Sequence, residues 1–236
     1  MKQRLSSRNL SGIIKLLIVT AIVALGTYRA FYVTPDVKDN STQNLTTVSS
    51  PAGESLQSLP IKGRAPKTGY TRTAFSEGWD SSGTCDVRNL ILARDMTNIT
   101  YVDGTCKVAS GTLLDPYTAK TIAFTRGLDT SDDVQIDHVV ALSDAWQKGA
   151  QQLTYDQRHQ LANDPLELLA VDGATNQQKG DGDAATWLPP NKAFRCSYVA
   201  RQIAVKKKYS LWITRSEYDA MAKVLSSCPD QKLPTS

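Results

Sequence analysis

The sequence predicts an α+β fold in which short strands form small sheets and helices surround them. Two observations support this class: short strand-like and helix-like segments alternate along the chain, and no internal repeat is present. The chain has 236 residues, of which 41% are hydrophobic and 21% are charged. This composition excludes a fibrous or wholly disordered chain. The length predicts one domain with extensions, or two small domains.

The first predicted elements are one short helix and several short strands. Residues 87–96 place apolar side chains on one face and Arg88 and Arg94 on another, which is typical of a helix. Turns are expected at Asp103-Gly104 and Asp115-Pro116. The strands around these turns are predicted at residues 99–102, 107–111 and 112–114.

The second half of the chain is predicted to be richer in helix. We expect Ser143 to cap a helix that Gly149 ends. Thr214 and Glu217 have the spacing of a capping box, which opens a last helix ending at Leu225. The other elements are predicted as strands at residues 134–140 and 166–171 and helices at residues 143–148, 154–161, 174–179 and 197–208.

The N-terminus has the pattern of an export signal. Residues 16–25 are almost wholly apolar, and basic residues but no acidic ones precede them. The wider stretch from residue 11 to residue 33 supplies the roughly 20 residues that span a bilayer. Residues 1–33 are therefore a cleaved signal peptide or an uncleaved membrane anchor. In both cases the positive charge keeps the N-terminus cytoplasmic, so the rest is extracellular or on the outer face of the cytoplasmic membrane.

The segment after the apolar stretch is predicted to be a linker. Residues 34–68 are rich in Ser, Thr, Pro, Asn and Asp and contain few large apolar side chains. Such a segment buries too little surface to offset the entropy of ordering. We therefore expect a flexible Ser/Thr/Pro-rich linker here and a folded domain over residues 69–236.

The net charge of +4 gives no evidence for a polyanionic partner. The excess of positive charge belongs to the first 30 residues, which hold Lys2, Arg4, Arg8, Lys15 and Arg29 and no acidic residue. The remaining chain is close to neutral. A claim for nucleic acid binding must therefore rest on a site rather than on bulk charge.

The four cysteines predict two disulfides, because an even number of cysteines in an exported chain is usually paired. Four cysteines allow three connectivities. We favour Cys85 with Cys106, which closes a loop across the first helix and strand, and Cys196 with Cys228, which ties the two C-terminal helices together. A metal cluster is the alternative, but the sequence has no Cys-x-x-Cys.

Two clusters of polar residues carry the chemical pattern. Asp137 and His138 stand side by side at the end of a predicted strand. Further on, another strand leads through a turn into a helix that bears Asn176 and, one turn later, Lys179. This order resembles the ββα-metal site of the HNH (His-Me finger) endonucleases.

A closer resemblance is to the HNH class of exported bacterial proteins related to the C-terminal domain of the GmrSD restriction enzymes. It covers most of the chain from Tyr70 to Cys228. The segments that carry it include Tyr70-Thr-Arg72, Cys85-Asp-Val-Arg88-Asn89, Asp115-Pro-Tyr117, Ile136-Asp-His-Val-Val-Ala-Leu142, Ala162-Asn-Asp-Pro165, Asn176-Gln-Gln-Lys-Gly-Asp181, Trp187-Leu-Pro-Pro190 and Arg195-Cys-Ser-Tyr198.

The resemblance implies a disulfide-stabilised ββα-metal core and assigns roles to its residues. His138 would be the general base, because imidazole can take a proton from water near neutral pH. Asp137 and Asn176 would be oxygen ligands of one Mg²⁺ or Mn²⁺ ion, which relieves charge on the phosphate and the leaving oxygen. The carbonyl of Ile136 or Val139 would fix the tautomer of His138.

Other roles are less closely determined by the pattern. Lys179 fits the family pattern as a phosphate contact, and Arg126 is a second candidate for substrate binding. The asparagine that orients the base in many HNH sites is missing, and the equivalent place holds Glu167. Glu167 or Asn163 would then orient His138. Arg88 is expected to be structural, and residues 206–208 are expected to be a solvated helix end.

The function predicted from these residues is that of an exported, metal-dependent HNH endonuclease. It would hydrolyse DNA, with RNA as a further possible substrate, and with little sequence preference, because no recognition module such as a helix-turn-helix is evident. Two alternatives stay open: a non-catalytic cell-surface binding module, and a hydrolase of another extracellular phosphodiester. Membrane contact would come only through an uncleaved N-terminus, and no protein partner is evident.

Overall fold

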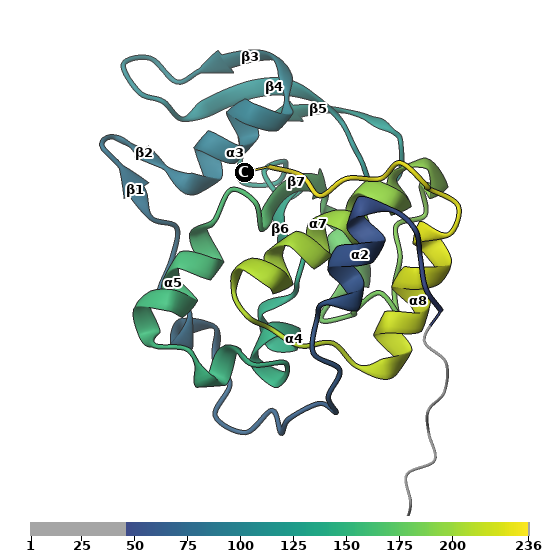
Figure 1. Ribbon diagram of the computed structural model, residues 1–236. Helices are drawn as coiled ribbons and strands as arrows, with labels where there is room; N and C mark the ends of the chain where they lie inside the picture. Colours follow the sequence, from purple (N-terminus) through teal and green to yellow (C-terminus); the bar gives the residue numbers. More distant parts are fainter. Residues whose placement is uncertain (1–45, 236) are drawn as a thin grey trace, which may run out of the picture. The chain divides into compact units, whose positions relative to one another are not determined.

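The computed structural model describes residues 46–235 and confirms the mixed α+β class with small sheets (Figure 1). The predicted export segment, residues 1–33, and the first part of the predicted linker lie outside these residues. Within residues 46–235, no helix is long and apolar enough to cross a membrane.

The first half of the described chain forms two small antiparallel sheets around one helix. Strands β1 and β2 make a two-stranded pair, and β3, β4 and β5 make a three-stranded sheet in that order. The elements are β1 Ser81–Ser82, β2 Cys85–Asp86, α3 Val87–Asp95, β3 Thr97–Tyr101, β4 Val108–Leu114 and β5 Thr121–Thr125. The predicted strands at residues 107–111 and 112–114 are one continuous strand, and β5 was not predicted.

A pair of buried strands forms the centre of the domain. Strand β6, Val134–His138, lies antiparallel to β7, Leu168–Asp172, so that His138 is opposite Leu168. Leu168 and Ala170 belong to the same core as α3 and β4, whereas Leu169 and Val171 belong to the core beneath the helices. Because side chains alternate between the faces of a strand, this pair joins both cores. Helix α6, Gly173–Lys179, follows at once and packs on both strands.

The second half of the chain is largely helical. Helices α2, α7 and α8 pack against one another (Figure 1). The elements are α2 Pro51–Gln57, η1 Arg72–Ala74, α4 Leu142–Gln147, η2 Ala150–Gln152, α5 Tyr155–Asn163, η3 Lys192–Phe194, α7 Arg195–Lys208 and α8 Arg215–Leu225. The predicted capping box of Thr214 and Glu217 is confirmed, whereas α4 begins after Ala141 and Ser143 is not its cap.

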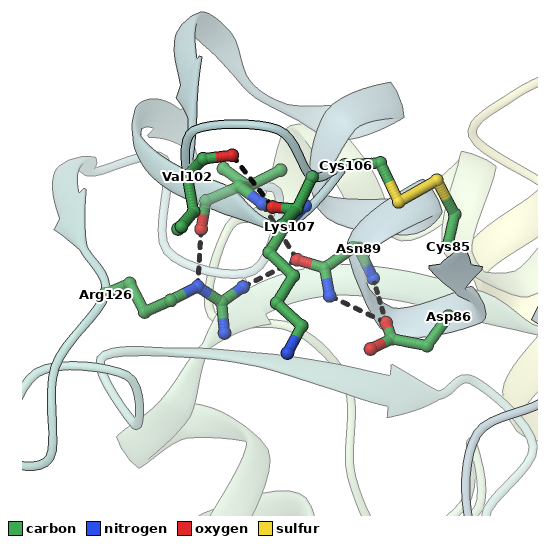
Figure 2. Close-up of a disulfide and its surroundings, with 9 residues drawn as sticks. Cys85, Asp86, Asn89, Val102, Cys106, Lys107 and Arg126 are labelled. Carbon is green, nitrogen blue, oxygen red and sulfur yellow. Dashed lines mark hydrogen bonds between the residues drawn. A yellow bond between two sulfur atoms is a disulfide. The ribbon is translucent and has the colours of Figure 1, made fainter.

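Both disulfides have the favoured connectivity. Cys85 is bonded to Cys106 with their Cα atoms 5.5 Å apart, and this bridge joins β2 to the loop before β4 (Figure 2). Cys196 on α7 is bonded to Cys228 just after α8, with a Cα separation of 6.3 Å. Each bridge restricts the unfolded chain and should stabilise the fold by about 2–4 kcal/mol.

The predicted flexible linker is wrong in its second half, because α2 is part of the core. Ser50 caps this helix by accepting a hydrogen bond from Gly53 N at 3.0 Å. Ala52 and Leu56 are fully buried with the residues of α7 and α8. The apolar positions, Val48, Ala52, Leu56 and Leu59, follow a helical spacing that the polar composition of the segment conceals.

The chain between α2 and η1 is also attached to the domain. Ile61 forms a parallel bridge with Ile213, and the indole of Trp212 donates to the Gly63 carbonyl at 3.0 Å. The folded unit therefore begins before residue 69, and a fragment that starts there would lack part of its core.

A buried ionic cluster joins the helical half to the chain between α2 and η1, through Arg64. Lys148 Nζ lies 2.8 Å from Asp144, 2.7 Å from Asp183 and 2.6 Å from Glu217. Lys206 pairs with Asp144 and Glu217, and Arg64 pairs with Asp144 and Asp183. Three cations therefore balance three carboxylates, as buried charges require. The expectation of a solvated helix end is wrong for Lys206, which is fully buried.

The role of α2 can be tested with Leu56→Ala. Leu56 is 0% exposed, so the substitution leaves a cavity and should lower the free energy of unfolding by about 2–5 kcal/mol. Urea unfolding followed by circular dichroism measures the change. Leu128 is 100% exposed, and Leu128→Ala should change stability by less than about 0.5 kcal/mol. Equal effects of the two substitutions would show that α2 is not docked.

Candidate functional site

Two neighbouring pockets meet at His138. The larger has a volume of about 330 Å³ and is lined by Asp137, His138 and Asn176, among others. The smaller has a volume of about 120 Å³ and is lined by Trp79, Ala162 and again His138. The structure thus brings together the three residues that the sequence predicted as base and metal ligands.

The strand pair and α6 position these side chains. Asp137 and His138 are the last two residues of β6, and Asn176 lies on the helix that follows β7. Helix α6 starts with Asp172 as its cap, which accepts from Thr175 N at 2.8 Å. Its first residue must be small, since a Cβ on Gly173 would lie 1.9 Å from the carbonyl oxygen of Asp132. This close approach holds the start of α6 against the chain that enters β6.

The imidazole of His138 has a defined orientation. Its Nε2 lies 2.9 Å from the carbonyl oxygen of Ala162, and its ring stacks on Trp79 with centroids 5.7 Å apart. A carbonyl can only accept, so Nε2 carries the proton and Nδ1 keeps its lone pair in the neutral ring. Nδ1 has no hydrogen-bond partner within residues 46–235. The expected carbonyl of Ile136 or Val139 is therefore replaced by that of Ala162.

The environment keeps His138 neutral. Burial lowers its pKa to about 3, and the positive charge of Arg72 acts in the same direction. The hydrogen bond to Ala162 opposes this change but does not cancel it. The imidazole is consequently in its proton-accepting form at neutral pH.

Asp137 is held by two partners from other elements. Its Oδ1 lies 2.8 Å from Lys179 Nζ, and its Oδ2 accepts a hydrogen bond from the hydroxyl of Tyr117. Burial raises the pKa of this carboxyl group, and the ammonium of Lys179 opposes that shift. Each carboxylate oxygen accepts one side-chain hydrogen bond and keeps a second lone pair.

The structure gives Lys179 another role than the predicted phosphate contact. Its side chain is 0% exposed, and its ammonium donates to Asp137 and to the His138 carbonyl at 2.8 Å each. It therefore binds the end of β6 to α6. Lys179 is not among the residues that line the larger pocket, and its ammonium is bound to Asp137 and to the His138 carbonyl, so the structure places it as a positioning residue rather than as the predicted phosphate contact.

Asn176 presents its oxygen rather than its nitrogen. Its Nδ2 donates to Gln135 Oε1 at 3.0 Å. Its Oδ1 accepts no hydrogen bond from any residue in the described range, and the residue lines the larger pocket. This is the orientation that a ligand of a hard cation requires.

Neither residue predicted to orient the base hydrogen-bonds to the imidazole of His138. The carboxylate of Glu167 is fully buried and accepts from Val140 N at 3.2 Å, so it shapes the chain after His138. Burial raises the pKa of Glu167 well above its usual value. Asn163 accepts from Asp80 N at 3.0 Å and donates to the His159 carbonyl. These two predictions are wrong because a backbone carbonyl already occupies Nε2 of His138.

Arg126 is also corrected, because it lies outside both pockets. Its guanidinium donates to the Val108 carbonyl and to Asn89 Oδ1 beside the Cys85–Cys106 disulfide (Figure 2). Arg126 thus supports β4 and α3 rather than a phosphate. Arg88 donates to the carbonyls of Ser131 and Val134 at 3.0 Å, which confirms its predicted structural role.

The donor atoms at the larger pocket suit a hard divalent cation. Within residues 46–235, no group of three or more His, Cys, Asp or Glu side chains could hold a metal ion. Mg²⁺ nevertheless needs few protein ligands, because it retains several waters. The free oxygen of Asn176 and the remaining lone pairs of Asp137 line one pocket and fit this requirement in kind. The nearby ammonium of Lys179 offsets the charge of Asp137, which weakens its attraction for a cation.

Sequence reasoning missed four groups at this site. Tyr117, Trp79 and the carbonyl of Ala162 hold Asp137 or His138, and Arg72 lines both pockets. Tyr117 and Arg72 belong to segments that carried the family resemblance, so that signal was available. No sequence signal marks a backbone carbonyl.

Comparison with known proteins identifies the family. Residues 86–224 match the model of the GmrSD restriction endonucleases, C-terminal domain. The chain is also 35% identical over 215 residues to an uncharacterized secreted protein of the fungus Arthroderma benhamiae, which covers 90% of this chain and 98% of that protein. No solved structure matches the chain. The chain belongs to the GmrSD C-terminal domain family.

Family membership and the relative give coarse functional conclusions. A restriction endonuclease domain indicates a nuclease-like function and a nucleic acid substrate. The name of the secreted relative and the two disulfides indicate an extracellular protein.

The lowered pKa of His138 predicts a stability that depends on pH. An unfolded histidine titrates near 6.5 and the folded one at about 3, so between these values the unfolded chain binds more protons. Stability due to His138 is therefore present above about pH 6.5 and is lost as the pH falls toward 3. From pH 7 to pH 4, the wild type should lose about 3 kcal/mol more than His138→Gln, as measured by urea unfolding.

Parallel stability curves for the two proteins would contradict this. The difference between them isolates His138 from the buried carboxyl groups of Asp137 and Glu167, whose raised pKa values act in the opposite sense.

Proposed function

We propose that the chain is an extracellular, metal-dependent endonuclease of the HNH type that hydrolyses DNA, and RNA as a second polynucleotide. The observation that carries the proposal is the unpaired Nδ1 of His138 in the same pocket as Asp137 and Asn176. Phosphodiester hydrolysis by this mechanism needs a proton acceptor beside two oxygen atoms that can ligate a divalent cation. In this proposal β6, β7 and α6 are the ββα core of the family.

His138 would act as the general base. Its Nδ1 would take a proton from the attacking water, which produces an imidazolium ring. The Ala162 carbonyl holds the proton on Nε2 and would stabilise that positive charge. The stacked indole of Trp79 would keep the plane of the imidazole ring fixed.

Asp137 and Asn176 would hold one Mg²⁺ or Mn²⁺ ion. When bound, the ion supplies charge relief to the phosphate and the leaving oxygen. Tyr117 and Lys179 would fix Asp137, and Gln135 would fix Asn176, so that both oxygens are oriented before substrate arrives.

Low sequence specificity is part of the proposal. No helix-turn-helix is present among residues 46–235, and the substrate would be held mainly through phosphate groups. Residues 1–33 would export the chain, as a cleaved signal peptide or as a membrane anchor.

A second candidate function is a non-catalytic surface module. The ammonium of Lys179 already offsets the charge of Asp137 in the structure, which favours a site that binds no cation. A hydrolase of another extracellular phosphodiester would use the same residues and differ only in its polymer.

The proposal predicts metal-dependent nicking of supercoiled plasmid by the full chain with its disulfides intact. Cleavage should occur with Mg²⁺ or Mn²⁺ and stop in EDTA. His138→Ala should lower the rate by about 10²-fold or more, because the general base is removed. Agarose gel electrophoresis of timed samples measures the rate.

His159 is the other histidine of the chain and provides the matched control. It pairs with Asp80 and lines neither pocket, so His159→Ala should cleave like the wild type. If the folded protein cleaves no plasmid with either metal, the DNA nuclease proposal fails. Activity on RNA, or on a synthetic phosphodiester alone, would then select between the remaining candidates.

A further inference from the structure

The cations around the two pockets are mostly committed to other groups. Lys179 is bound to Asp137, and Lys67 pairs with Asp181 at 3.2 Å. Arg64 is held by the buried carboxylates, with 2.7 Å to Asp183. Arg158 donates to the carbonyls of Ala74 and Leu153. None of these side chains offers an unbound guanidinium or ammonium at the pockets.

Arg72 is different from these cations. It lines both pockets and lies next to His138 in each. Its side chain is exposed, and its guanidinium makes no hydrogen bond or ion pair with any residue that the structure describes. Five N–H donors are therefore available at the junction of the pockets.

The backbone that carries Arg72 is firmly held. Thr71 caps the short 3₁₀ turn η1 by accepting from Ala74 N at 3.2 Å. Arg158 donates to the carbonyl of Ala74 at 2.7 Å. Phe75 is 0% exposed and packs against Tyr70 and Trp146. The backbone of Arg72 is fixed while its guanidinium has no partner in the described structure. This arrangement suits a residue that binds a ligand.

The larger pocket holds carboxylates that would repel a phosphate, so a phosphate bound there needs a cation among the lining residues. Its carboxylates are Asp137 and Asp181, each of which already has a lysine partner. A phosphodiester that approaches Nδ1 of His138 would therefore meet carboxylate oxygens and no free cation other than Arg72 among the residues lining the two pockets. A guanidinium can bind two phosphate oxygens at once through its planar fork.

We propose that Arg72 binds the phosphate of the substrate next to His138, in the role that the sequence had given to Lys179 and Arg126. The inference deepens the proposed nuclease function and rests on it for the identity of the substrate. Arg72 is then a substrate-binding residue that sets where the polynucleotide strand crosses the two pockets.

Binding without cleavage tests this inference. A short fluorescein-labelled single-stranded DNA is titrated with the full chain in EDTA, and fluorescence anisotropy gives the affinity at rising NaCl. Each phosphate contact contributes about 0.7 to the slope of log K against log salt for single strands. Arg72→Gln should reduce that slope by about this amount and weaken binding about tenfold at low salt.

Two further variants separate a phosphate contact from loss of charge or fold. Arg215 pairs with Asp219 on α8 and lines neither pocket, so Arg215→Gln removes the same charge and should keep the wild-type slope. Arg72→Lys keeps the charge but loses the fork. It should keep the slope and bind with intermediate affinity. Thermal unfolding confirms that all variants are folded.

The outcomes distinguish the inference from the proposed function. A reduced slope for Arg72→Gln alone supports the Arg72 contact, even if plasmid nicking fails. Equal slopes and affinities for Arg72→Gln and Arg215→Gln overturn it, even if the wild type cleaves DNA. A wild type that binds no oligonucleotide overturns the Arg72 contact, and plasmid nicking with Mg²⁺ or Mn²⁺ then decides the nuclease proposal by itself.

Discussion

The burial of Asp137 at the end of β6 is the constraint on which the site depends. A carboxylate in the core must be paired, and its partners are Lys179 of α6 and Tyr117 of the segment after β4. Pairing with Lys179 fixes α6 against the strand. Asn176 lies one turn earlier on the same helix, so this ion pair also brings its amide to the pocket. One buried charge thus sets the relative positions of the base and the two oxygen donors.

The other side of His138 is built from segments distant in the sequence. The carbonyl of Ala162 comes from the last turn of α5, and Trp79 comes from the chain before β1. Asn163 joins these two segments, because its side chain accepts from the backbone of Asp80. Asn163 therefore affects the base only through its neighbours. The imidazole is confined between a carbonyl and an indole, and burial lowers the pKa of the ring.

The sequence predicted the elements that carry local signals. A capping box marked α8, the alternation of segments indicated the class, and the family resemblance pointed to Asp137, His138 and Asn176. Contacts between residues far apart in the chain could not be predicted from the sequence. Lys179 was predicted as a phosphate contact and Lys206 as part of a solvated helix end, whereas the fold buries both against carboxylates. Lysines are seldom buried, so the sequence alone favours an exposed position for them. Helix α2 was missed because four apolar side chains lie among many polar ones.

The tautomer of His138 is the property that the structure determines most specifically. The chain contains two histidines, so ¹⁵N nuclear magnetic resonance of the ring nitrogens can resolve both. At about pH 7 the spectrum should show a neutral His138 ring with the proton on Nε2. A proton on Nδ1, or an imidazolium ring at about this pH, would contradict the assignment of His138 as a base held ready by Ala162.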